Sequence, residues 1–262
     1  MSAAEASRPL ALVTGASTGI GRELARLCAA EGMDLLIAAD EPAVEEAAAE
    51  LRRSGVRVDA VETDLSTTAG VDALLARLDG RPVDCLFANA GRVLGKGFLD
   101  QEFDAARHVL DTNLTGTLYL IHRVGGDMRR RGEGRILITG SIAGFVPGAF
   151  MAVYNGTKAF LNSFAFALRN ELKDTGVTVS CLMPGATDTE VFARGDMLDT
   201  PMGQAPKDDP ADVARVGFEA LMQGKGDAVS GWKNKVASAL ANVTPAAVLA
   251  EQNRKLAEPG HG

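Results

Sequence analysis

Cysteine and aromatic residues are scarce in this sequence. Its 262 residues include three cysteines, two tyrosines and one tryptophan. Cys28, Cys85 and Cys181 lie far apart in apolar surroundings, without the paired spacing of a disulfide framework or a zinc site. The three histidines also lack the spacing of metal ligands. We therefore expect three buried thiols, no metal, and a reducing compartment such as the cytoplasm.

Long apolar runs and an excess of positive charge are also missing. No stretch reaches the roughly 18 apolar residues that a membrane-spanning helix needs. Residues 1–8 are polar and lack the apolar centre of a signal peptide. The formal net charge is -7 at pH 7, which disfavours nucleic acid and anionic membranes as partners. We expect a cytoplasmic protein for which membrane contact is not favoured.

Apolar residues, by contrast, make up 46% of the chain, enough for a sizeable core. Strand-like runs occupy residues 10–13, 35–39, 56–61, 83–88, 135–139, 177–182 and 228–230. Helical patterns occupy residues 19–31, 42–54, 67–78, 103–131, 150–175 and 210–223. Most of the strand-like runs are nearly all apolar, which is typical of parallel strands buried on both faces. The pattern predicts one α/β domain over residues 1–262, a doubly wound Rossmann-type parallel sheet of about seven strands with helices on both faces.

Two segments depart from the alternation of strands and helices. Residues 187–209 contain several glycines and prolines among apolar residues, which favours a lid over a substrate cleft; the alternative is a surface excursion over the edge of the core. Residues 231–262 form an Ala- and Val-rich tail with a helical pattern. This tail either packs as a C-terminal helix, covers the substrate pocket, or contacts a membrane or partner.

The first strand runs directly into a glycine-rich turn that is followed by a helix. Glycine allows a sharp turn and a close approach to a pyrophosphate, and the helix N-terminus offers free N–H groups. The spacing Gly-x3-Gly-x-Gly at a strand–helix junction predicts a dinucleotide-binding loop. Its expected cofactor contacts are Gly15, Ser17, Thr18, Gly19, Ile20 and Gly21.

Further cofactor contacts are expected at the ends of later strands. Asp40 follows the second strand, where a carboxylate accepts hydrogen bonds from the ribose hydroxyls and repels a 2′-phosphate. No Lys or Arg lies within the glycine loop or right after that strand, so we favour NAD over NADP. The alternative is that Asp40 only ends the strand and starts the next helix.

The third and fourth strands end in polar or small residues. Asp64, before Leu65, is a candidate acceptor for the adenine amino group, and a helix cap is the alternative. Asn89, Ala90 and Gly91 end the fourth strand, where small residues leave room for a cofactor.

The reactive residues are expected after the fifth strand. Ser141 closes that strand, and Tyr154 and Lys158 share one face of the following helix because they are four residues apart. A nearby ammonium group favours the phenolate form of tyrosine and should lower its pKa. Tyr154 would then take or give the alcohol proton, while Ser141 holds the substrate oxygen.

Taken together, these pieces resemble the compact single-domain branch of the short-chain dehydrogenase/reductase family. The match spans roughly residues 10 to 189 and comprises Gly15, Gly19, Gly21, Asp64, Asn89, Ala90, Gly91, Asn113, Ser141, Tyr154, Lys158, Pro184 and Gly185. The resemblance implies that Asn113 completes the catalytic set by holding a water that links Lys158 to solvent. It also implies that Lys158 and Tyr154 border the cofactor, with Lys158 hydrogen-bonding the nicotinamide ribose.

The resemblance has two further implications. Pro184, Gly185, Thr187 and Thr189 are placed at the nicotinamide end, where Thr189 is favoured over Thr187 as the hydroxyl that reaches the carboxamide. The helices over 103–131 and 150–175 would pack against those of a second subunit, which implies a homodimer or a homotetramer.

The predicted function is hydride transfer between NAD(P) and a small-molecule substrate, a mainly uncharged and fairly hydrophobic secondary alcohol or ketone. Apolar positions expected to line the substrate pocket are Val93, Leu94, Ile142, Phe145, Phe150, Met151, Phe192, Met197 and Met202. The alternatives are a catalytically silent dinucleotide-binding redox sensor and a lyase or epimerase that acts on nucleotide sugars. The complete set of four catalytic residues argues against the first alternative, and the short C-terminal region argues against the second.

Overall fold

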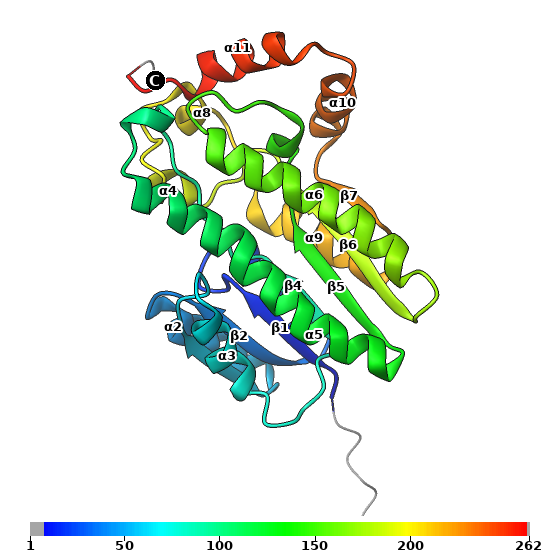
Figure 1. The fold of residues 1–262 in the computed structure, drawn as a ribbon. Coiled ribbons are helices and arrows are strands. Elements are labelled where there is room, and N and C mark those ends of the chain that lie inside the picture. Colours follow the sequence, from blue (N-terminus) through cyan, green and yellow to red (C-terminus); the bar gives the residue numbers. More distant parts are fainter. Residues whose placement is uncertain (1–7, 261–262) are drawn as a thin grey trace, which may run out of the picture.

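A computed structural model describes residues 8–260, which form one α/β domain built on a seven-stranded parallel sheet (Figure 1). The strands are β1 (Leu10–Thr14), β2 (Asp34–Ala39), β3 (Val58–Glu62), β4 (Cys85–Ala88), β5 (Gly134–Thr139), β6 (Val177–Met183) and β7 (Asp227–Val229). Their order across the sheet is β3-β2-β1-β4-β5-β6-β7. The predicted fold class is therefore confirmed. The first seven and last two residues of the predicted domain lie outside the described residues.

Helices cover both faces of the sheet, as Figure 1 shows for α5 and α6 in front and α9 behind. The helices of the sheet layers are α1 (Gly19–Ala30), α2 (Ala43–Leu51), α3 (Thr68–Ala76), α4 (Phe103–Leu110), α5 (Thr117–Arg131), α6 (Ala152–Leu172) and α9 (Pro210–Met222). One apolar core joins the sheet to α1, α2 and α9, and the other joins it to α3, α5 and α6. Alternate residues of β1 enter opposite cores, because successive strand side chains point to opposite faces.

The helix predicted over residues 103–131 is interrupted in the structure. A π-helical turn, Asp111–Gly116, separates α4 from α5 and contains Asn113. Such wide turns are rare and often occur at functional sites. The chain also passes close to another segment here, because a Cβ atom at Gly116 would lie 1.7 Å from the carbonyl oxygen of Leu65. Only glycine fits at this position.

The order of the strands fixes where a ligand can lie. The chain winds outward in one direction from β1 to β3 and in the other direction from β4 to β7. The carboxyl ends of β1 and β4 therefore border a crevice at the point where the strand order reverses, the usual ligand position in doubly wound sheets.

The two irregular segments contain short helices. Residues 187–209 include α7 (Val191–Arg194) and α8 (Pro201–Gln204), and the tail forms α10 (Trp232–Ala241) and α11 (Ala246–Ala257). The last two helices lie with α8 at one end of the molecule (Figure 1).

Cys28, Cys85 and Cys181 are buried free thiols, as expected. Burial raises the pKa of Cys85 to about 11 and that of Cys181 to about 12, so both are protonated at neutral pH. None of the helices within residues 8–260 has the length and apolar character needed to cross a membrane.

Candidate functional site

The glycine-rich turn after β1 forms one wall of the crevice. A Cβ atom at Gly21 would lie 2.0 Å from the carbonyl oxygen of Gly15, so the turn can close only around glycine. Helix α1 begins without a capping side chain, because Thr18 at its N-cap makes no side-chain hydrogen bond to the first turn. The first turn also has no acidic residue. Its N–H groups and the positive end of the helix dipole therefore remain available to an anionic group.

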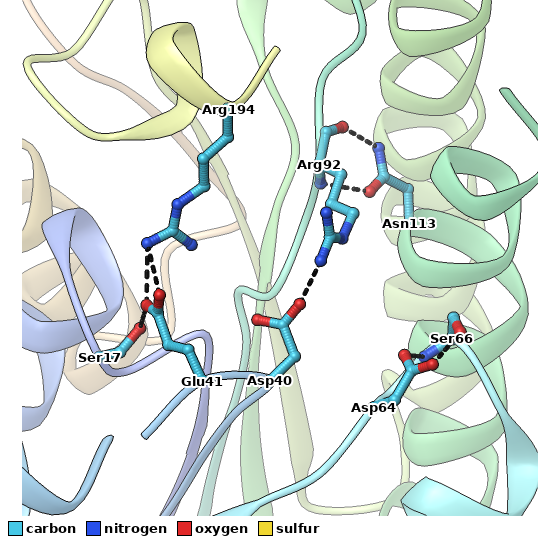
Figure 2. A network of polar contacts seen from close by, with 8 residues as sticks. All are labelled: Ser17, Asp40, Glu41, Asp64, Ser66, Arg92, Asn113 and Arg194. Atoms are coloured by element: carbon cyan, nitrogen blue, oxygen red, sulfur yellow. Dashed lines mark hydrogen bonds and ion pairs between the residues drawn. The ribbon is translucent and has the colours of Figure 1, made fainter. Parts of the chain in front are cut away.

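At the end of β2, the Asp40 carboxylate is paired with the guanidinium group of Arg92, which follows β4 (Figure 2). A guanidinium group therefore lies beside Asp40, although no Lys or Arg lies within the glycine loop or right after β2. Arg92 is 52 positions from Asp40 and reaches it across the crevice through the fold.

The neighbouring carboxylate, Glu41, joins the glycine-rich turn to the segment 187–209. Its oxygens accept a hydrogen bond of 2.5 Å from the Ser17 hydroxyl and hydrogen bonds of 2.8 and 2.9 Å from Arg194 of α7 (Figure 2). Partial burial acts to raise the pKa of Glu41, but the hydrogen bonds from Ser17 and Arg194 outweigh it and leave the pKa below its usual value. Glu41 is thus ionised at neutral pH.

The Asp64 carboxylate stabilises the turn before α3. It accepts hydrogen bonds of 2.9 Å from both the backbone N–H and the hydroxyl of Ser66 (Figure 2). Burial acts to raise the pKa of Asp64, and these hydrogen bonds lower it below its usual value. The cap of α3 itself is Thr67, whose hydroxyl accepts from the N–H of Gly70. Asp64 still lines the crevice beside Leu65.

Hydrogen bonds hold the end of β4 to the strands on both sides. The Thr14 hydroxyl of β1 accepts from the backbone N–H groups of Asn89 and Ala90, both at 3.0 Å. The Asn89 amide donates to the Thr14 carbonyl at 3.1 Å and accepts from the Thr139 hydroxyl of β5, also at 3.1 Å. The floor of the crevice is therefore fixed by side chains from three strands.

Ser141 is held by an asparagine that the sequence did not single out. The amide of Asn162, on α6, donates to the Ser141 carbonyl at 2.9 Å and accepts from the Ser141 N–H at 3.3 Å. The Ser141 hydroxyl accepts from the N–H of Ala143 at 3.0 Å and donates to the Pro184 carbonyl at 3.3 Å. Asn162 is 3% exposed, so its two hydrogen bonds are shielded from water.

Tyr154 and Lys158 lie one helical turn apart on α6, as predicted. The Lys158 ammonium nitrogen lies 5.8 Å from the centre of the Tyr154 ring and donates a 2.8 Å hydrogen bond to the Thr139 carbonyl. Burial raises the pKa of Tyr154, and the nearby Ser141 hydroxyl opposes this only in part. The lowered pKa that we expected for Tyr154 is therefore not a property of the protein alone, because burial of the ring outweighs its polar surroundings.

Burial has the corresponding effect on the ammonium group. It lowers the pKa of Lys158 to about 8, although the nearby Cys181 thiol acts in the opposite direction. Burial thus makes the charged form of Lys158 energetically unfavourable in the isolated protein. A bound anionic or polar group would relieve that cost.

Asn113 lies behind the crevice wall and is completely buried. Its amide accepts a 2.7 Å hydrogen bond from the N–H of Arg92 and donates to the Arg92 carbonyl at 2.9 Å (Figure 2). It also donates to the Thr157 hydroxyl at 3.0 Å, and that hydroxyl donates to the Tyr154 carbonyl. The π-helical turn therefore positions Asn113 between Arg92 and the helix that carries Tyr154.

The segment after β6 closes the other end of the crevice. The Thr187 hydroxyl donates to the Gly185 carbonyl at 3.1 Å, and the Thr189 hydroxyl donates to the Thr187 carbonyl at 3.4 Å. Asn234 of α10 packs directly on Gly185, where a Cβ atom would lie 2.4 Å from its amide nitrogen.

One cleft contains all the predicted cofactor contacts together with Ser141. Its predicted lining residues are Gly15, Ser17, Thr18, Gly19, Ile20, Gly21, Asp40, Asp64, Leu65, Asn89, Ala90, Gly91, Ser141, Tyr154, Lys158, Pro184, Gly185, Thr187 and Thr189. Asn113 is the one predicted catalytic residue that does not line it. Sequence reasoning missed Arg92, Glu190 and Arg194, which also line the cleft. Arg92 follows β4, Glu190 precedes α7 and Arg194 ends that helix, so only the fold determines that they lie here.

A second cavity of about 390 Å³ adjoins this cleft, and Ser141, Tyr154 and Gly185 line both. Five of the nine apolar positions predicted for a substrate pocket line it: Val93, Ile142, Met151, Phe192 and Met202. The other four, Leu94, Phe145, Phe150 and Met197, do not line it. The C-terminal tail supplies Asn234, Ala237, Ser238, Ala241, Leu249, Gln252, Asn253 and Leu256. Within residues 8–260, no Asp, Glu, Lys, Arg or His lines this cavity.

Comparison with known proteins identifies the family to which the chain belongs. The profile of the family described as short chain dehydrogenase matches residues 9–196. An uncharacterized oxidoreductase of Myxococcus xanthus is 32% identical over 247 residues, which cover 92% of this chain and 95% of that protein.

Solved structures agree with this match. A short-chain dehydrogenase from Sphingobium yanoikuyae in complex with NADPH has a TM-score of 0.80 and 28% identity, covering 90% of this chain and 94% of that one. A short chain dehydrogenase/reductase from Burkholderia phymatum in complex with NAD has a TM-score of 0.81 and 26% identity, covering 91% and 94%. The chain belongs to the short-chain dehydrogenase/reductase family of oxidoreductases.

Proposed function

We propose that this protein transfers a hydride between a nicotinamide dinucleotide and a mainly uncharged, fairly hydrophobic secondary alcohol or ketone. The observation that carries the proposal is the position of Ser141 and Tyr154, which line both the cleft that contains the predicted cofactor contacts and the apolar cavity beside it. A reacting carbon at this boundary would face a cofactor on one side and have its apolar substituents in the cavity on the other.

The residues of the cleft fit a dinucleotide. The glycine turn and the uncapped start of α1 suit a pyrophosphate, because Gly21 allows close approach and the first-turn N–H groups have no capping side chain. Asp40 would hold the adenosine ribose, Lys158 the nicotinamide ribose, and residues 184–189 the nicotinamide end. When bound, the cofactor supplies hydride transfer at its nicotinamide ring.

Tyr154 would act as the general acid or base. Because burial raises its pKa, the phenol is protonated in the resting protein and is ready to donate its proton to a carbonyl oxygen during reduction. Oxidation needs the phenolate, which the Lys158 ammonium and the positive charge of an oxidised nicotinamide would both favour. Ser141 would hold the substrate oxygen by its hydroxyl, whose direction Asn162 and Ala143 restrict.

Lys158 and Asn113 would connect Tyr154 to the proton supply. Gly91 lies between them: a Cβ atom there would lie 3.4 Å from the Asn113 amide oxygen and 3.6 Å from the Lys158 nitrogen. A side chain at this position would separate the two groups. We therefore assign a proton relay to Lys158 with Asn113, in keeping with the family resemblance.

The lining of the second cavity supports the proposed substrate class. Its walls are mainly apolar, and the side chains of Asn155, Asn234 and Gln252 are among its few polar groups. An anionic substrate would lose its hydration there without meeting a cation, which is unfavourable. We therefore propose that carboxylated and phosphorylated substrates are disfavoured.

We propose NAD as the favoured cofactor, since Asp40 can accept hydrogen bonds from both hydroxyls of the adenosine ribose. The Sphingobium yanoikuyae relative was solved with NADPH and the Burkholderia phymatum relative with NAD, so either cofactor is compatible with related cleft architectures.

We also propose roles for the two covering segments and for the helices of the interface. Residues 187–209 would act as the substrate lid, and α10 and α11 would form the outer wall of the pocket, because both segments line the cavity. A homodimer or homotetramer through α4, α5 and α6 is supported by exposed Phe103 on α4 and exposed Phe160 and Phe166 on α6. The buried free thiols support a cytoplasmic location.

A substrate screen tests the proposal. Ketones and secondary alcohols of increasing apolar size would be compared with matched carboxylated and phosphorylated compounds, and the absorbance of the reduced nicotinamide followed with NADH and NADPH in parallel. We expect turnover with apolar carbonyls, or their alcohols in reverse, and weak turnover with charged ones. Dinucleotide binding without turnover of any carbonyl or alcohol would favour the silent redox sensor, and preference for small anions would contradict the proposed substrate class.

A further inference from the structure

Two carboxylates and two guanidinium groups meet at the adenosine end of the cleft (Figure 2). Asp40 is paired with Arg92, and Glu41 is paired with Arg194. These four side chains are between 29% and 43% exposed, so both pairs are open to solvent and to an incoming ligand. The formal charges of the four groups cancel, which differs from the net negative site that the sequence around Asp40 predicts.

We propose that Arg92 is a specificity-determining residue that binds the 2′-phosphate of NADP, so that the chain accepts both dinucleotides although an aspartate follows β2. This inference rests on the proposed function. With NAD, Asp40 accepts from the ribose hydroxyls and Arg92 balances its charge. With NADP, the Arg92 guanidinium leaves Asp40 and pairs with the phosphate.

Arg92 is better placed for this role than Arg194. It makes one side-chain hydrogen bond among the described residues, from Nη2 to the Asp40 carboxylate, and its remaining guanidinium donors are available. Arg194, by contrast, donates to both oxygens of a carboxylate that the Ser17 hydroxyl also binds. Guanidinium groups match the geometry of phosphate and can bind it through two parallel hydrogen bonds.

The backbone of Arg92 is fixed independently of its side chain. Asn113 accepts from its N–H at 2.7 Å and donates to its carbonyl at 2.9 Å. The guanidinium group therefore pivots from a fixed point on the crevice wall. Both hydrogen bonds to Asn113 come from the Arg92 backbone, so Arg92→Ala can keep them. The substitution therefore removes the guanidinium group without displacing Asn113.

The two charges at this point predict opposite effects of substitution. A hydrogen bond between charged groups contributes more to binding than a hydrogen bond between neutral groups. Partial exposure of the Arg92 guanidinium to solvent reduces that contribution. We expect Arg92→Ala to weaken NADP binding about tenfold to a hundredfold and to change NAD binding less than about threefold. We expect Asp40→Asn to strengthen NADP binding relative to NAD by about tenfold, because it removes the repelling charge.

Isothermal titration of the full-length protein with NAD and with NADP, without substrate, tests these expectations. Arg130→Ala is the control, because Arg130 is exposed on α5 and paired with Asp127. In the unsubstituted protein we expect the two dissociation constants to lie within about tenfold of each other. The proposal is overturned if that protein binds NAD but not NADP, or if Arg92→Ala leaves the ratio of the two constants unchanged. Failure of both dinucleotides to bind would instead reject the proposed function and the inference that rests on it.

Discussion

Arg194 donates hydrogen bonds of 2.8 and 2.9 Å to the two carboxylate oxygens of Glu41, 153 positions away in the chain. The contact joins α7, within residues 187–209, to the loop that follows β2. Because Glu41 also accepts from Ser17, the proposed lid is tied to the turn that would hold the pyrophosphate. Movement of this segment and occupation of the cleft should therefore be coupled.

Arg194→Ala should loosen residues 187–209 without unfolding the domain. An ion pair that is this exposed contributes at most about 1 kcal/mol to stability, so the free energy of unfolding should change little. Limited proteolysis of the folded protein should cut within residues 187–209 several times faster than in the unsubstituted protein. The control is Arg215→Ala, which removes an exposed pair with Asp212 on α9. Equal cleavage rates in the two variants would show that the Arg194 pair does not restrain the segment.

Asn162→Ala should lower kcat by about tenfold or more while leaving the dissociation constant of the dinucleotide unchanged. The substitution removes both hydrogen bonds from Asn162 to the Ser141 backbone. The Ser141 carbonyl keeps its hydrogen bond from the Gly144 N–H, but the buried Ser141 N–H loses its partner, which should cost about 1–3 kcal/mol of stability. Asn170→Ala, at an exposed position of the same helix, provides the control.

A double-substitution cycle distinguishes positioning from a general loss of structure. If Asn162 acts through Ser141, adding Asn162→Ala to Ser141→Ala should cause little further loss of kcat. Additive losses from the two substitutions would mean that Asn162 affects the reaction by another route.

The Lys158 ammonium should make the stability of the cofactor-free protein depend on pH. Burial lowers its pKa to about 8 in the folded state, against 10.5 for an ordinary lysine. Below pH 8 the group is charged in both states and its burial is unfavourable. Between about pH 8 and 10.5 the unfolded chain binds a proton that the folded chain has released, so stability rises with pH over this window.

Chemical denaturation at a series of pH values measures this effect as a difference from Lys158→Met. The unsubstituted protein should gain up to about 3 kcal/mol relative to that variant as pH rises through the window. Lys173→Met, at the exposed end of α6, should show no comparable trend. A difference that is constant with pH would mean that Lys158 titrates at its ordinary value.

The size of the apolar cavity should limit the substrates that bind. Ala241 lines the cavity from α10, whereas Ala239 on the same helix is exposed and does not line it. Ala241→Phe should raise KM for bulky ketones by about tenfold, because a buried ring occupies the space of the substrate. Ala239→Phe should leave KM unchanged, and both variants should bind the dinucleotide normally. Unchanged KM in both variants would place the substrate elsewhere.

Local sequence patterns predicted the elements of the fold well. The alternation of apolar runs and helical patterns located all seven strands to within a few residues, because strands buried on both faces leave a strong signal. The glycine spacing, Ser141 and the Tyr154 and Lys158 pair were also assigned to one site, and the structure brings them around one cleft. Each of these signals resides in a short, contiguous stretch of chain.

Features that depend on distant segments could not be predicted in this way. Arg92 and Asp40 are 52 positions apart, and no local pattern indicates that the crevice brings them together. The π-helical turn around Asn113 replaces part of a helix whose sequence looks continuous. The part of the tail that lines the cavity has the same apolar pattern as an ordinary packed helix. Its position at the cavity depends on where β7 ends in the folded sheet, which the pattern does not indicate.

Tyr154→Phe tests the central claim, that the Tyr154 hydroxyl transfers the proton where the cofactor cleft meets the apolar cavity. The substitution removes one oxygen and keeps the ring, so folding and dinucleotide binding should be nearly unchanged. The decisive measurement is kcat, followed by reduced-nicotinamide absorbance with the best carbonyl from the screen, alongside the dissociation constant of the dinucleotide. We expect kcat to fall by about 100-fold to 10,000-fold with that constant retained. A variant that binds the dinucleotide and keeps most of its turnover would contradict the role assigned to Tyr154.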